Sequence, residues 1–171
     1  MKKTITVFGS SMPLPGDEEY ETAYKLGRLL AENNFNVCSG GYGGIMDAVS
    51  KGAKESGAEV TGVTVKIFKR IPSKFLTKEI KTNTLFERID KLIEVGDGFV
   101  VLRGGTGTLV ELSVVWEYMN KNIIPLKPVV CHGKMWRDLV KAIDRRMDYE
   151  GRRTGIVKYC NNLEDIISFL I

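Results

Sequence analysis

The segment from Leu102 to Glu111 reads LRGGTGTLVE and places a glycine-rich turn between an apolar run and a helical pattern. A glycine turn that opens a helix points free N–H groups and the positive end of the helix dipole at a bound anion. The hydroxyl groups of two threonines in the turn add further donors. We therefore expect the phosphate group of a nucleotide-like ligand to lie against Gly104, Gly105, Thr106, Gly107 and Thr108.

Two more loops of small residues follow apolar runs, at residues 9–11 and 39–44. In parallel α/β sheets, such loops gather at the carboxyl ends of the strands, where ligands bind. Glycine is also common in any tight turn, because it takes positive φ freely. Three loops at one edge nevertheless favour a shared binding crevice. None of them completes the G-x-G-x-x-G or G-x-x-x-x-G-K-[ST] pattern, which argues against a nucleoside triphosphatase.

Glu111 stands in the first turn of a predicted helix, residues 108–120, that is apolar on nearly every side. Such a helix is expected to be mostly buried. Two interpretations of this carboxylate remain open. In one, Thr108 and Glu111 form a capping box, in which the glutamate satisfies an amide at the start of the helix. In the other, Glu111 faces the crevice, one helical turn from the phosphate.

Arg88 is a second charged residue in apolar company. It stands at the edge of the apolar stripe of a predicted helix, residues 84–95, beside Leu85 and Leu92. One interpretation is an arginine whose aliphatic stem covers the core while its head reaches water. The other is a guanidinium aimed at a phosphate or carboxylate, which it would bind as a fork.

The remaining polar candidates indicate less. His132 is the only histidine and follows a predicted strand, as a turn residue does. No cluster of His, Cys, Asp and Glu has metal-ligand spacing, so no metal site is expected. One basic loop is either a solvated segment or a flap over the phosphate site; its cations are Lys66, Lys69, Arg70, Lys74, Lys78 and Lys81.

Apolar strand-like runs alternate with helical patterns along the whole chain. The strands are predicted at residues 5–9, 35–38, 59–65, 98–102, 127–131 and 156–159, and the helices at 17–33, 44–56, 84–95, 108–120, 135–149 and 163–170. A basic loop is predicted over residues 66–81. This alternation is typical of βαβ units and predicts an α/β fold with a doubly wound, mostly parallel sheet flanked by helices. Residues 1–171 are expected to make a single domain.

Composition limits the class of protein. With 171 residues and 43% hydrophobic content, the chain can bury a sizeable core. A net charge of +4 suits an anionic small molecule but is too low to indicate nucleic-acid binding. Three cysteines without a C-x-x-C pair favour reduced thiols and a cytoplasmic location. No segment is long and apolar enough to suggest a signal peptide or a membrane span.

Three segments together resemble the Lonely Guy (LOG) family. They are GGYGGIMDAV at residues 40–49, ER at residues 87–88 and GGTGTLVE at residues 104–111. The first is similar to the G-G-G-x-x-G-L-M-G-A-V motif of that family and the last to its P-G-G-G-T-x-x-E motif. Order and spacing hold over residues 5–149. These proteins are Rossmann-like phosphoribohydrolases, often labelled lysine decarboxylases, although no lysine here stands out as a pyridoxal phosphate partner.

The resemblance implies cleavage of the N-glycosidic bond of a nucleoside 5′-monophosphate, such as a cytokinin riboside monophosphate or AMP, without a cofactor. The essential glutamate and arginine of the family fall on Glu111 and Arg88. The glycine loop would hold the 5′-phosphate. Family members are usually dimers with sites near the interface, so a homodimer is expected. The residues expected on the base and ribose side are Ser10, Gly41, Gly43 and Met46.

The chain departs from the family pattern at three places. Arg103 replaces the proline before the glycine loop, where an arginine adds a phosphate contact or changes the loop. Ile89 replaces the lysine that usually follows the arginine, and Leu85-Phe86 replaces Met-His of plant-type enzymes. A related branch, the molybdenum cofactor carrier proteins, binds a phosphate-bearing pterin without cleaving it. A non-catalytic carrier is therefore the alternative to the enzyme.

Overall fold

Strand β1 (Thr4–Phe8) lies at the centre of a seven-stranded sheet whose order is β4-β3-β2-β1-β5-β6-β7. The computed structural model of the chain describes residues 2–171. The other elements, in chain order, are α1 (Glu18–Glu32), β2 (Asn36–Ser39), α2 (Ile45–Glu55), β3 (Val60–Val65), the short 3₁₀ helix η1 (Lys66–Phe68), β4 (Lys78–Thr82), α3 (Leu85–Val95), β5 (Gly98–Val101), α4 (Thr106–Asn120), β6 (Val129–His132), α5 (Lys134–Tyr149), β7 (Val157–Cys160) and α6 (Leu163–Leu170).

Every neighbouring pair of strands in this sheet is parallel. The chain first adds β2, β3 and β4 on one side of β1, then returns to add β5, β6 and β7 on the other. The doubly wound α/β fold expected from the sequence is thus confirmed. Strand order reverses between β1 and β5, and ligands of such sheets bind at this point, beyond the carboxyl ends of the strands.

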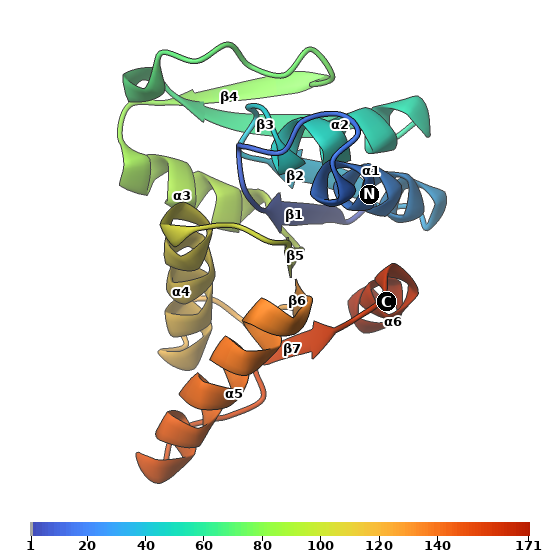
Figure 1. The fold of residues 1–171 in the computed structure, drawn as a ribbon. Coiled ribbons are helices and arrows are strands. Elements are labelled where there is room, and N and C mark those ends of the chain that lie inside the picture. Colours follow the sequence, from blue (N-terminus) through green and yellow to red (C-terminus); the bar gives the residue numbers. More distant parts are fainter. Residues whose placement is uncertain (1) are drawn as a thin grey trace.

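Two helix layers cover the sheet, and Figure 1 shows α1, α2 and α6 on one face and α3, α4 and α5 on the other. Alternate residues of each central strand supply the two cores. In β1, Ile5 and Val7 pack toward the first layer, whereas Phe8 belongs to the core under the second layer. In β5, Val100 packs toward the first layer and Phe99 toward the second. Burial on both faces explains why these strands read as continuous apolar runs.

The structure differs from the predicted elements in the basic segment and at the start of α4. The basic loop expected over residues 66–81 contains β4, an edge strand with the sequence KEIKT that is mostly exposed and lacks an apolar stripe. Its strand form comes from pairing with β3, where Val63 lies opposite Ile80. Helix α4 begins at Thr106, two residues before the predicted start. Its outer face is also more exposed than its apolar sequence suggested, because Leu109 and Val110 face outward.

No helix within residues 2–171 combines the length and the apolar character that a bilayer crossing requires.

Candidate functional site

A cavity of about 510 Å³ opens at the sheet edge where the predicted loops meet. Its lining comes from the loops after β1, β2, β3 and β5, from Met46 of α2, and from the first two turns of α3 and α4. The crevice expected from the three small-residue loops is therefore present. Its lining residues are Gly9, Ser10, Ser11, Met12, Tyr42, Met46, Phe68, Arg70, Leu85, Arg88, Ile89, Gly105, Thr106, Gly107, Thr108, Val110 and Glu111.

The glycine loop delivers the start of α4 into this cavity. Gly105 is the N-cap residue, and no side chain caps the helix. The first intrahelical bond runs from the Leu109 N–H to the Gly105 carbonyl, so the N–H groups of Thr106, Gly107 and Thr108 have no partner within the helix. Free amides and the helix dipole make this end of α4 suited to an anion.

The capping interpretation of Glu111 is wrong. Thr108 lies inside α4 rather than at its N-cap, so Thr108 and Glu111 do not form the box. Glu111 instead accepts a hydrogen bond from Arg88, with 3.3 Å between Nη1 and Oε1. Both partners are buried: Arg88 is 5% exposed and Glu111 is 9% exposed. The two charged residues that the sequence placed in apolar company therefore form an ion pair within the cavity wall.

Three nitrogens of Arg88 are engaged by the protein. Its Nε donates to the carbonyl of Val63 at 2.8 Å, and Nη2 donates to the carbonyl of Gly40 at 3.2 Å. Nη1 is thereby aimed at Glu111. The solvent-reaching interpretation of Arg88 is wrong, since the guanidinium points inward. Gly40 must be glycine here, because an added Cβ would overlap Nη2 of Arg88.

Helix α3 carries Arg88 and has a well-defined start. Thr84 accepts a hydrogen bond from the Glu87 amide, and the Glu87 carboxylate accepts one in return from the Thr84 amide, which is a capping box. The buried residues of α3 include Ile89 and Leu92, which pack against the sheet. The cap and the packed stripe together hold the arginine at one position.

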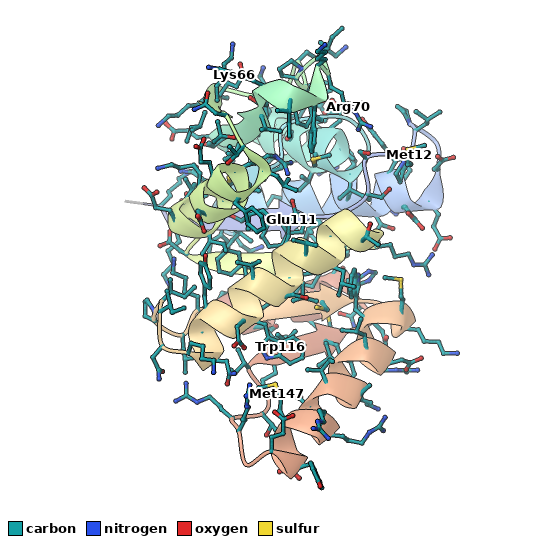
Figure 2. All side chains as sticks on the ribbon, turned by 90° about the vertical axis from the view of Figure 1, so that its left-hand side faces the viewer. Met12, Lys66, Arg70, Glu111, Trp116 and Met147 are labelled. Atoms are coloured by element: carbon teal, nitrogen blue, oxygen red, sulfur yellow. The ribbon has the colours of Figure 1, made fainter. Side chains whose placement is uncertain are left out.

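Burial raises the pKa of the Glu111 carboxyl from 4.5 to about 7, although the charge and the hydrogen bond of Arg88 act in the opposite direction. A carboxyl group with this pKa exchanges a proton near neutral pH. Figure 2 shows Glu111 near the start of α4, below the segment that carries Lys66 and Arg70. Strongly shifted groups in a cavity are candidates for acid–base chemistry.

Two neighbouring aromatic rings lie beside the guanidinium. The centre of the Arg88 guanidinium lies 5.8 Å from the ring centroid of Tyr42 and 5.8 Å from that of Phe68. The Tyr42 hydroxyl donates to the carbonyl of Val65 at 2.9 Å and accepts from the amide of Val65 at 2.8 Å, which fixes its ring. These rings cover the cation and keep it from moving toward solvent.

The loops of the cavity rim are tied to one another. The Ser10 amide donates to the carbonyl of Arg103 at 2.9 Å, and the Ile45 amide donates to the carbonyl of Ser10 at 2.8 Å. Gly44, with φ of 68°, sits so close to this loop that a Cβ would overlap Ser10 and Ser11. The loops after β1, β2 and β5 thus form one connected surface.

Some of the predicted site residues line the cavity and others do not. Those that line the cavity are Ser10, Met46, Arg88, Gly105, Thr106, Gly107, Thr108 and Glu111. Gly41, Gly43 and Gly104 are not among its lining residues. Gly41 has φ of 76° and packs against Thr64 and Gly62, and a Cβ on Gly104 would overlap the Thr108 hydroxyl. These glycines shape the loops, and their contact with a ligand stays a prediction.

Several lining residues were not singled out as site residues from the sequence, among them Tyr42, Phe68 and Arg70. Tyr42 lies inside the small-residue loop, where a bulky ring among glycines was the available signal. Phe68 and Arg70 belong to the basic segment, and Arg70 is the one of its six cations that lines the cavity. A flap role of the whole segment over a phosphate stays a prediction. The spacing of residues in this segment does not show which of its cations lies at the cavity.

Arg103 points away from this cavity. Its guanidinium pairs with Glu19 of α1, at 3.5 Å, and it lines a separate small hollow together with His132. The cavity lining does not include Arg103, so the phosphate contact suggested for this residue stays a prediction. The turn role predicted for His132 was wrong, since it is the last residue of β6, where its Nε2 lies 3.1 Å from the carbonyl oxygen of Asn161. Among residues 2–171, no group of three or more His, Cys, Asp and Glu side chains could hold a metal ion.

The fold and the cavity define a Rossmann-like α/β protein with a buried Arg–Glu pair at its switch point. The chain belongs to the SLOG cluster4 family, whose model matches residues 2–163. The resemblance to LOG proteins is thereby confirmed.

Relatives and solved structures agree with this assignment. The cytokinin riboside 5′-monophosphate phosphoribohydrolase of Rhodococcoides fascians is 32% identical over 124 residues, which cover 69% of this chain and 63% of the relative. The probable cytokinin riboside 5′-monophosphate phosphoribohydrolase LOG4 of Oryza sativa subsp. japonica is 34% identical over 158 residues, covering 85% of this chain and 65% of the relative. The chain thus spans slightly less than two thirds of the length of these relatives.

A solved structure of similar fold is the molybdenum cofactor binding protein of Rippkaea orientalis. It has a TM-score of 0.77 and 23% sequence identity, and the match covers 98% of this chain and 94% of that one. At this identity the likeness concerns the fold alone.

Proposed function

We propose that this protein hydrolyses the N-glycosidic bond of a nucleoside 5′-monophosphate and releases a free base and ribose 5-phosphate. The observation that carries the proposal is the position of Glu111. Its carboxyl group is buried, is held at Oε1 by Arg88, and lines the same cavity as the free amides of the glycine loop, one helical turn away. The names of the relatives from Rhodococcoides and rice support the same reaction.

The reaction breaks the bond between C1′ of the ribose and a ring nitrogen of the base. Glycoside cleavage of this kind passes through an oxocarbenium-like state, with positive charge on C1′ and the ring oxygen. Ionised Glu111 stabilises that charge and accepts a proton from the attacking water. The water oxygen bonds to C1′ as the bond from C1′ to the base nitrogen breaks. The proton accepted by Glu111 passes to the departing base, which leaves Glu111 ionised again. With a pKa of about 7, Glu111 is matched to this proton transfer near neutral pH.

The 5′-phosphate lies against the start of α4 in this proposal. The amides of Thr106, Gly107 and Thr108 are free, and the dipole of α4 favours a negative charge. Ribose and base then extend past Glu111 along the wall that contains Ser10 and Met46. Cytokinin riboside monophosphates and AMP are the candidate substrates, and no cofactor is needed for this chemistry.

Arg88 acts as a positioning residue. Its three nitrogens already donate to Val63, Gly40 and Glu111, so its fixed role is to orient the carboxylate. A buried guanidinium also keeps part of the Glu111 population ionised, because it opposes the effect of burial on the pKa.

We also infer a homodimer. Apolar side chains are exposed on two adjacent helices, at Leu85 and Phe86 of α3 and at Leu109 and Val110 of α4. The helices touch, since the Tyr118 hydroxyl donates to Asp90 at 2.9 Å. An apolar patch of this kind is typical of an interface. Because Leu85 and Val110 also line the cavity, a second copy placed here lies beside the cavity mouth.

The test is to incubate the protein with AMP and other nucleoside monophosphates, and to measure free base and ribose 5-phosphate by chromatography. We expect both products in equal amounts from at least one substrate. The matching nucleosides, which lack the phosphate, are the control and should react much more slowly. If every monophosphate is bound but none is cleaved, the protein is a carrier and the proposal fails.

A further inference from the structure

The charges of the cavity leave one cation without a counter-ion. Three charged residues line it: Arg70, Arg88 and Glu111. Arg88 and Glu111 neutralise each other in their ion pair. Within residues 2–171, Arg70 forms no ion pair, and its hydrogen bond is to the hydroxyl of Ser11. A phosphate monoester carries close to two negative charges at neutral pH, and the glycine loop offers amides, threonine hydroxyls and a helix dipole in return but no cationic side chain.

Arg70 reaches the side of the cavity where the glycine loop lies. Its Nη1 donates to Oγ of Ser11 at 3.1 Å. Ser11 follows Ser10, whose amide is bonded to the carbonyl of Arg103 at the start of the glycine loop. Figure 2 shows Arg70 above Glu111, on the side of the picture that also holds Met12. The guanidinium therefore faces the cavity from the rim that the glycine loop shares.

The segment that carries Arg70 is anchored at both ends. On one side, the ring of Phe68 packs against the ring of Tyr42, with 5.9 Å between centroids. On the other side, the Ser73 amide donates to the carbonyl of Gly41 at 2.8 Å, and its hydroxyl donates to Asp47 at 2.6 Å. Of the four residues between these anchors, Arg70 is the one that lines the cavity. Arg70 is thus held close to the cavity, although its side chain is exposed.

We propose that Arg70 is the residue by which this chain selects a phosphorylated ligand. Its guanidinium pairs with the phosphate oxygens that the amides of α4 leave free, and Ser11 holds it ready for that contact. Arginine suits this role because its planar fork matches two phosphate oxygens. The inference deepens the proposed function, since it assigns the phosphate contact of that same site. It also holds for a carrier that binds a phosphate-bearing ligand without cleaving it.

The experiment compares wild type with Arg70→Ala, Arg70→Lys and the control Lys74→Ala. Lys74 is an exposed cation of the same segment that does not line the cavity. Ribose 5-phosphate is titrated into each protein by calorimetry, because it is the proposed product and is not cleaved further. Steady-state rates with AMP and with adenosine are then measured where turnover occurs.

We expect Arg70→Ala to weaken ribose 5-phosphate binding by roughly 10- to 100-fold, the range for a hydrogen bond to a charged group. Arg70→Lys should recover part of this loss, and Lys74→Ala should bind like wild type. With AMP, Arg70→Ala should raise KM by a similar factor and leave kcat within about twofold, which is the signature of lost uniform binding. Adenosine turnover should not change.

The assignment of Arg70 would be overturned if Arg70→Ala lowered kcat/KM equally for AMP and adenosine. It would also be overturned if Lys74→Ala weakened ribose 5-phosphate binding as much as Arg70→Ala does. A wild type that binds ribose 5-phosphate but cleaves no monophosphate refutes the proposed hydrolysis, and the binding comparison still decides the role of Arg70. A wild type that binds neither ribose 5-phosphate nor AMP refutes both.

Discussion

Arg88 and Glu111 form a buried ion pair that stability alone does not explain. Removing two charges from water is costly, and an apolar pair of similar size often gives an equally stable protein. Here the cost is visible in the carboxyl group, whose pKa is raised to about 7. A carboxylate kept partly protonated at the wall of a cavity is what an acid–base step at neutral pH requires. The pair is therefore better understood through the chemistry of the site.

The pH dependence of base release follows from this shift. The reaction needs ionised Glu111, so kcat/KM should rise with pH and level off above about 7, the pKa of that carboxyl in the folded protein. Arg88→Gln removes the group that lowers this pKa, and the acid limb should then move to higher pH. Rates measured from pH 5 to 9 test both statements. A wild-type limb near pH 4.5, or an unmoved limb in Arg88→Gln, would show that Glu111 is not the titrating group.

At the residue scale, residue type and spacing singled out Glu111 and Arg88 but did not show that the two side chains pair. Each had a structural and a functional interpretation, because local spacing does not show that two helices separated in sequence face each other. Contact between α3 and α4 decided between them. Tyr42 and Phe68 were missed for the same reason, since their rings contact the guanidinium of Arg88 from segments far from it in the sequence.

At the scale of single elements, the first turn of α4 determines what the cavity can bind. The glycine loop lets the helix start at Thr106 without a side-chain cap, which leaves its amides for a ligand. The sequence predicted this helix and its anion site but placed its start two residues late, because Thr108-x-x-Glu111 mimics a capping box. Strand β4 was missed because its residues are mostly exposed, and backbone pairing with β3 leaves no apolar pattern.

Gly107→Ala separates the structural from the binding role of the first turn. An added Cβ at Gly107 has no protein atom within 4 Å, and alanine favours a helix over glycine by about 1 kcal/mol. We expect thermal unfolding at an unchanged or higher temperature, together with weaker binding of ribose 5-phosphate, because Gly107 lines the cavity at the place where we propose that the phosphate binds. Unchanged affinity in a stable variant would place the phosphate elsewhere.

At the scale of the whole molecule, one sheet runs through the described residues and brings four loops to one edge. This supports the proposal that the chain is a single domain. Alternation of strands and helices was enough to predict the architecture, since βαβ units have few ways to pack. The hydrophobic pattern did not indicate a dimer interface in the same way. Because α4 is apolar on nearly every side, the pattern predicted that most of this helix is buried, and it did not show that one face is exposed.

The proposed dimer gives a direct prediction for that face. Phe86 is 70% exposed on α3, and Phe86→Asp places a charge in the apolar patch. We expect wild type to sediment as a dimer and Phe86→Asp as a monomer, because an unpaired charge is costly in an interface. Ile171→Asp is the matched control, since Ile171 is 82% exposed beside α6, in the other helix layer. A monomeric wild type, or dissociation in both variants, would contradict the proposed interface.

The most direct test of the account is base release from AMP, or from the best monophosphate substrate, by wild type and Glu111→Gln. The amide keeps the shape of the carboxyl group and can still accept the hydrogen bond from Arg88, so folding and ribose 5-phosphate binding should be retained. The account predicts that turnover falls by roughly 10²- to 10⁴-fold, the contribution of one positioned acid–base group. A folded Glu111→Gln protein that releases base at the wild-type rate would contradict it.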